Sequence, residues 1–192
     1  MRHAILLAVA LFAAACTSIP APTLQPFEDG NDWLLTSPLV YRVGTTGEKI
    51  IVPAGFVTDL ASVPRGLCTL LSSTDRYMRA AIVHDFLYWD QTCTKKQADK
   101  TLLAAMIEAN VAPWKRTAVY LGVDVGGGGA WASNAEDRRN RLIRVIPKQH
   151  RNIPSGVTWF QYRRQLAANR VVEAPYARPT PAACMAYQQI TP

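Results

Sequence analysis

The chain has 192 residues, of which 49% are hydrophobic and 18% charged, and its formal net charge is +7. This length suits one domain with a sizeable core, and no apolar stretch is long enough to cross a bilayer, which argues against a transmembrane protein. The positive charge favours attraction to anionic lipid head groups over binding to nucleic acid, with an ordinary solvated surface as the alternative.

The first 16 residues, MRHAILLAVALFAAAC, begin with a basic residue, continue with an apolar run and end in small residues at Cys16. This order is typical of a secretory signal peptide. The last four residues also resemble the bacterial lipobox, in which the cysteine is lipidated; ordinary cleavage nearby is the alternative. Because Thr17 follows the cysteine, the resemblance implies an outer-membrane lipoprotein whose membrane anchor is the lipid on Cys16.

Composition divides the rest of the chain into three parts. Residues 17–32 are proline-rich and are predicted to form a flexible tether, and residues 33–170 a single globular domain. Residues 171–192 are again rich in proline and poor in core-forming residues. We expect them to form an irregular tail that packs loosely, if at all.

The globular part is predicted to be mainly α with a small N-terminal β-hairpin, an α+β fold. Residues 34–43 and 49–60 are rich in β-branched and aromatic residues and flank the turn sequence GTTGE, which predicts the hairpin. Periodic apolar residues predict helices over 77–90 and 96–110, and the short connection, in which either threonine can cap the second helix, makes them an antiparallel pair.

Two further segments follow the pair. A third helix is expected to start near Trp114 and to pack on the pair until the glycines at 126–129 interrupt it, where a close helix contact or a flexible joint is expected. Residues 136–151 are strongly basic with interleaved apolar residues. They suit either an amphipathic edge facing anionic lipid or a solvated face.

The helix pair carries the polar residues that are hardest to explain by packing. His84 and Asp99 lie at nearly equal distances from the turn, so they should face each other, and Tyr88 lies one helical turn after His84. Asp99 would then fix one imidazole nitrogen and leave the other free to act as a base. Asp85 points elsewhere and is a candidate metal ligand. The alternative is a buried cluster that only holds two helices in register.

Three cysteines remain after Cys16, and the predicted compartment permits disulfides. We expect a bridge between Cys68 and Cys93, which would clip the loop before the first helix to the end of that helix. Cys184 would then be left over.

The strings VPAGFVTDLASVPRG, RAAIVHDFLY and ADKTLLAAM occur in that order and resemble the uncharacterised phage and bacterial family DUF1353 over about residues 35–131. A phage-encoded lipoprotein of this kind suits a non-catalytic role, such as altering the host surface or blocking a competing phage.

The helix pair also resembles, more distantly, the secreted phospholipases A2 of bacterial type. The resemblance implies His84 as general base, Asp99, Tyr88 and Tyr120 as its supports, and Asp85 as a calcium ligand. The glycine-rich calcium loop is replaced by DLASVPRGLC, so backbone carbonyls of residues 60–66 or Asp59 would complete the calcium site. The alternative for Asp59 is a local turn network with Thr58 and Ser62 that organises this segment. Arg65 could contact a phosphate or pair with a local carboxylate. The leading hypothesis is a calcium-assisted lipid ester hydrolase of the envelope.

Overall fold

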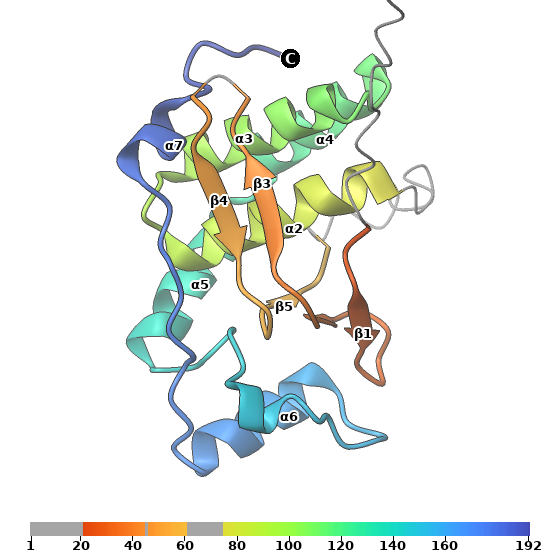
Figure 1. The fold of residues 1–192 in the computed structure, drawn as a ribbon, viewed down its shortest axis with the longest axis vertical. Helices are drawn as coiled ribbons and strands as arrows, with labels where there is room; N and C mark the ends of the chain where they lie inside the picture. Colours follow the sequence, from red (N-terminus) through yellow and green to blue (C-terminus); the bar gives the residue numbers. More distant parts are fainter. Residues whose placement is uncertain (1–20, 45, 61–74) are drawn as a thin grey trace, which may run out of the picture.

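The structure is a computed structural model that describes residues 21–44, 46–60 and 75–192. Over these residues the protein is a helix-dominated α+β fold, as the sequence predicts (Figure 1). Within the same residues, no helix combines the length and the apolar content needed to cross a membrane.

The predicted β-hairpin is confirmed. It consists of β3 (Leu39–Arg42) and β4 (Lys49–Val52), which pair in antiparallel fashion. In β4, Ile50 and Val52 are fully buried, whereas the residues between and before them are exposed. This alternation places one face of the hairpin on the core, where β4 packs against the first long helix.

A second sheet has the order β1-β2-β5 and is formed by β1 (Leu24–Pro26), β2 (Trp33–Leu35) and β5 (Val57–Thr58). Strand β1 lies inside the segment predicted to be a flexible tether, and Phe27 after it is 3% exposed, with its ring centroid 5.5 Å from that of Trp159. The tether prediction is therefore wrong for residues 24–27. The proline content of this segment predicts an extended tether, but β1 is an edge strand, and an edge strand tolerates proline.

The predicted helix pair is present as α2 (Asp75–Asp90) and α3 (Lys95–Glu108), which pack against each other. Gln91 has a φ of +58° and ends α2, as expected for a left-handed residue after a helix. Thr94 then caps α3, and its side chain and that of Gln97 form a reciprocal capping box. The third helix, α4 (Pro113–Gly126), packs on α3 as expected.

The glycine run separates α4 from α5 (Gly128–Arg139), which packs against α2 and α4. A Cβ atom at Gly127 would lie 2.4 Å from Tyr88 Oη and 2.5 Å from the carbonyl oxygen of Val123. At Gly128 and Gly129 a Cβ atom would meet nothing within 4 Å. Of the two expected roles for this run, a close helix contact is confirmed at Gly127.

The apolar residues of the basic segment 136–151 face the core. Ile143 is 5% exposed, and Val145 and Ile146 are fully buried. Arg144 donates hydrogen bonds to the backbone oxygen of Val57 and to Asn134 Oδ1. The interpretation of this segment as an amphipathic edge facing lipid is therefore wrong for these apolar side chains. The short 3-10 helix η1 (Lys148–His150) and α6 (Trp159–Ala168) follow it.

The C-terminal segment is anchored along its length, contrary to the predicted loose tail. It runs from α6 up one side of the molecule to α7 (Pro181–Met185) (Figure 1). Glu173 Oε1 accepts hydrogen bonds from the backbone nitrogens of Arg144 and Val145, and Arg178 pairs with the buried Asp90. Near the end of the chain, Tyr187 Oη accepts a hydrogen bond from the backbone nitrogen of Gly44.

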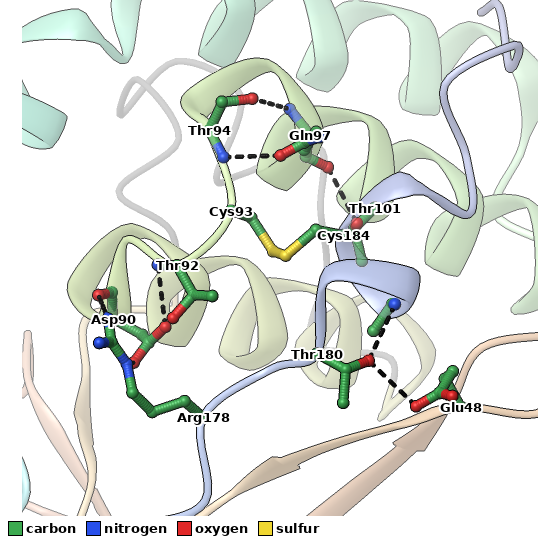
Figure 2. Close-up of a disulfide and its surroundings, with 11 residues drawn as sticks. Glu48, Asp90, Thr92, Cys93, Thr94, Gln97, Thr101, Arg178, Thr180 and Cys184 are labelled. Atoms are coloured by element: carbon green, nitrogen blue, oxygen red, sulfur yellow. Dashed lines mark hydrogen bonds and ion pairs between the residues drawn. A yellow bond between two sulfur atoms is a disulfide. The ribbon is translucent and has the colours of Figure 1, made fainter.

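A disulfide fastens the same segment to the turn between α2 and α3. Figure 2 shows Cys184 of α7 joined to Cys93, with the capping box of Thr94 beside it. The two Cα atoms are 5.2 Å apart. The predicted pairing of Cys93 with Cys68 is therefore wrong, because α7 brings Cys184 to Cys93 across 91 residues of chain. Cys68 itself lies outside the described residues.

Candidate functional site

His84 and Asp99 meet between α2 and α3, as their equal distances from the turn predict. The imidazole Nε2 lies 2.9 Å from Asp99 Oδ1. His84 is 3% exposed and Asp99 is fully buried. Burying either polar group alone would carry a large desolvation cost. The hydrogen bond between the two offsets this cost and explains why both are found in the interior.

Two more donors reach the carboxylate of Asp99. The hydroxyl of Tyr88 donates to Oδ1 at 2.7 Å, as the sequence predicts, and its ring centroid lies 4.1 Å from that of His84. Lys95 Nζ lies 2.7 Å from Oδ2 and also donates to the backbone oxygens of Val123 and Asp124 in α4. The cluster therefore ties α2, α3 and α4 together.

Lys95 is not among the site residues predicted from the sequence. The four-residue spacing from Lys95 to Asp99 on one helix was an available signal for an ion pair. Its further bonds to α4 depend on where that helix packs, and no local pattern gives that position.

The electrostatics of Asp99 reflect these contacts. Burial alone would raise the pKa of its carboxyl group, but the hydrogen bonds from His84, Lys95 and Tyr88 outweigh burial and lower the pKa below its usual value. Burial and the bond to this carboxylate raise the pKa of Tyr88. Asp99 therefore remains ionised and can stabilise a positive charge on the imidazole.

Tyr120 does not take the place expected for it. It lies on α4 and is 8% exposed, but within the described part of the chain no hydrogen bond joins it to Asp99. His84 and Tyr88 bind Oδ1 of Asp99, and Oδ2 is bound by Lys95 instead of Tyr120. The expectation that Tyr120 supports Asp99 directly is wrong for this reason.

The second imidazole nitrogen has a different environment. His84 Nδ1 is buried and has no hydrogen-bond partner among the described residues, and Asp85 Oδ1 lies 3.9 Å from it. Nε2 lies within hydrogen-bonding distance of the Asp99 carboxylate and is the nitrogen that donates to it, so in a neutral imidazole the lone pair is on Nδ1. The arrangement thus leaves a base on the side of the ring that faces Asp85.

Asp85 is held by β5. Its Oδ2 accepts a hydrogen bond of 2.5 Å from Thr58 Oγ1, and Thr58 Oγ1 in turn accepts one from the backbone nitrogen of Leu60. Leu60 has a φ of +59°, a conformation that leucine rarely adopts. Through Thr58, Leu60 at the end of the described segment is thus fixed to the same helix that carries His84.

The predicted metal ligands do not form a complete site within the described residues. Asp59 Oδ1 lies 3.5 Å from Arg144 Nη2. Across residues 21–44, 46–60 and 75–192, no group of three or more His, Cys, Asp or Glu side chains is placed to hold a metal ion. Calcium takes six to eight oxygen ligands. The predicted ligands at 61–66, Arg65 and the lipidation site Cys16 lie outside the described residues.

The sequence blocks that surround this cluster have a counterpart among known families. Residues 33–123 match the family described as "Protein of unknown function (DUF1353)". This match supports the resemblance to DUF1353, and it covers both strands of the hairpin, the helix pair and most of α4. No curated protein matches the chain, and no solved structure matches it. The resemblance to secreted phospholipases A2 therefore has no support from these comparisons.

The DUF1353 match includes Asp99 and the three side chains that bind it, His84, Tyr88 and Lys95. It ends before α5, α6 and the C-terminal segment that the disulfide fastens. The candidate site thus lies in the part that matches the family. Helix α5, which packs against α2, and the C-terminal segment lie beyond that part.

Proposed function

We propose that the His84 cluster is a hydrolytic site for lipid esters, carried by a lipoprotein of the bacterial outer membrane. The observation that carries the proposal is the buried Nδ1 atom of His84, which lacks a hydrogen-bond partner among the described residues while Asp99 holds Nε2. An unpaired polar atom in a protein interior costs about 1–3 kcal/mol. A base that accepts a proton from water needs such an open lone pair.

The chemistry follows from the two nitrogens. Nδ1 takes a proton from a water molecule, and the oxygen of that water forms a bond to the ester carbonyl carbon. The tetrahedral adduct collapses as the bond to the leaving oxygen breaks, and the imidazolium returns its proton to that oxygen. Asp99 stays ionised, holds the tautomer through Nε2 and stabilises the imidazolium.

Calcium remains an expectation from the phospholipase resemblance. Among the described residues, Asp85 offers one carboxylate near Nδ1, and Thr58 already binds one of its oxygens. That donor set alone does not satisfy calcium, so the steps above use only the histidine and its carboxylate. The leader ending at Cys16 supports the proposed location beside a lipid substrate.

A second candidate function is favoured by the burial of the ring. The side chain of His84 is 4% exposed, so a substrate reaches Nδ1 only if neighbouring residues move. In this alternative the protein is a non-catalytic envelope lipoprotein that modifies the cell surface or blocks a superinfecting phage. The cluster then serves only to hold α2, α3 and α4 together.

The test compares His84→Gln with His150→Gln, a matched substitution on η1 outside the cluster. We expect the wild-type chain to release fatty acid from mixed phospholipid vesicles, and His84→Gln to reduce the rate by roughly 10²–10⁴-fold without a large change in melting temperature. His150→Gln should retain the wild-type rate. Parallel reactions with calcium and with a chelator test the metal expectation.

If the wild-type chain releases no fatty acid under either condition, the hydrolase proposal fails. Asp99→Asn leaves Lys95 without its carboxylate partner under either proposal, so this variant tests the structural role of the cluster and does not separate the two functions. That variant should lower the free energy of unfolding by about 3 kcal/mol or more.

A further inference from the structure

Helix α4 exposes three large apolar side chains on one face. Trp114 is 56% exposed, Leu121 is 50% exposed and Val125 is 84% exposed. The spacings of seven and four residues place them within about 40° of one another around the helix axis. We call Trp114, Leu121 and Val125 the α4 face.

Elsewhere around its axis, α4 is packed normally. Val119 and Tyr120 are buried in a cluster with Leu102, Leu103 and Met106 of α3. The helix therefore carries two apolar sides, of which one packs on α3 and the other is exposed among the described residues. Large exposed apolar side chains aligned on one element mark an interaction surface more often than scattered ones do.

The charges beside the α4 face indicate what covers it. Lys115 Nζ lies 5.4 Å from the centroid of the Trp114 ring, and Arg116 follows directly. Tryptophan beside lysine is the combination found where a protein meets the lipid–water interface, since the indole enters the interface and the ammonium remains among the head groups. Asp124 is the one acidic residue of α4 and lies near its far end.

We propose that the α4 face docks on an anionic lipid surface. Trp114, Leu121 and Val125 enter the interface, and Lys115 pairs with lipid phosphate or carboxylate groups. The formal net charge of +7 adds a long-range attraction to the same surface. This docking surface is distinct from the basic segment 136–151, whose buried apolar residues cannot reach a lipid.

The helix that carries the α4 face is hydrogen-bonded to the His84 cluster through Lys95. Lys95 joins the backbone oxygens of Val123 and Asp124 to the carboxylate of Asp99, which holds His84. Docking of the α4 face would hold the chain at a surface that contains lipid esters. It does not depend on hydrolysis, and binding is measured without it.

The experiment uses the full chain and vesicles of phosphatidylcholine with phosphatidylglycerol whose acyl chains are brominated. Bromine quenches only a nearby indole, so the difference between the wild-type chain and Trp114→Phe reports the position of Trp114 even where other parts of the chain also bind the vesicle. The paired substitution Leu121→Asn with Val125→Asn is compared with Phe160→Asn with Val172→Asn. The last two residues are 68% and 79% exposed and lie outside α4.

We expect quenching of the Trp114 signal by brominated lipid. The α4 pair should weaken this quenching by roughly tenfold or more, since two apolar contacts are lost, and the control pair should leave it unchanged. Lys115→Gln should weaken it in vesicles with phosphatidylglycerol but not in phosphatidylcholine alone.

Three results would overturn the proposal. One is a Trp114 signal that brominated lipid does not quench, and another is an equal loss in the α4 and control pairs. The third is a concentration-dependent dimer in vesicle-free solution that only the α4 pair abolishes, because the face would then bind a second copy of the chain. Fatty-acid release is not part of the readout, so failure of docking and failure of hydrolysis are separate outcomes.

Discussion

The disulfide between Cys93 and Cys184 should make a large contribution to stability, and Cys184→Ala removes it. The bridge closes a loop with a sequence separation of 91 residues. Chain-entropy arithmetic for a loop of that length gives about 4.6 kcal/mol at 25 °C. In a protein of this size each kcal/mol corresponds to roughly 2–4 °C, so the melting temperature should fall by about 9–18 °C. The contacts of Arg178 and Tyr187 remain, so the variant should still fold.

The assay is urea denaturation of the wild-type chain, of Cys93→Ala, of Cys184→Ala and of the double variant. Either single substitution opens the same bridge, so all three variants should lose the same free energy of unfolding, and reduction of the wild-type chain should reproduce the loss. The result that refutes the reasoning is a stable Cys184→Ala beside an unstable Cys93→Ala. Cys93 would then be bonded to a cysteine other than Cys184.

Two further predictions concern single positions. Gly127→Ala should lower the free energy of unfolding by about 1–3 kcal/mol, because the new Cβ would lie 2.4 Å from Tyr88 Oη. The control Gly128→Ala, whose Cβ would meet nothing within 4 Å, should raise the free energy of unfolding by about 0.5–1 kcal/mol. Equal effects of the two substitutions in thermal denaturation would contradict the close contact. Burial, followed by the charge of Asp59, raises the pKa of Asp32 from 3.8 to about 6. The folded state therefore holds a proton that the unfolded state releases, and the free energy of unfolding falls as pH rises from 3.8 to 6. Asp32→Asn should therefore stabilise the protein more at about pH 8 than at about pH 4, and an equal gain at both values would exclude this origin.

The features that the sequence predicts correctly depend on short spacings. The helix pair follows from a three- and four-residue apolar period and a short connection, and the meeting of His84 with Asp99 follows from their equal distances from that connection. The hairpin is predicted in the same way, because its turn sequence lies between two β-rich runs. In each case the paired elements follow one another directly in the chain: His84 and Asp99 are 15 residues apart across one turn, and β3 and β4 are likewise joined by one turn.

The features that it misses depend on partners outside the segment itself, and the composition of the segment does not reveal them. Strand β1 is a strand because β2 pairs with it, and its own proline-rich sequence argues against one. The C-terminal segment is fixed by Asp90, Gly44 and Cys93, none of which is near it in the chain. Composition describes how a segment behaves alone, whereas these segments take their structure from the surface on which they lie.

The two candidate functions of the His84 cluster differ in what they require of the second imidazole nitrogen. A clamp between α2 and α3 needs a single donor toward Asp99, and the amide of a glutamine would provide one. Nδ1 adds nothing to that clamp, and its burial without a partner among the described residues costs free energy. A general base requires this nitrogen, because the lone pair is the group that accepts the proton. His84→Gln keeps a donor for Asp99 and removes the base, so loss of ester hydrolysis without loss of stability is the outcome that separates catalysis from scaffolding.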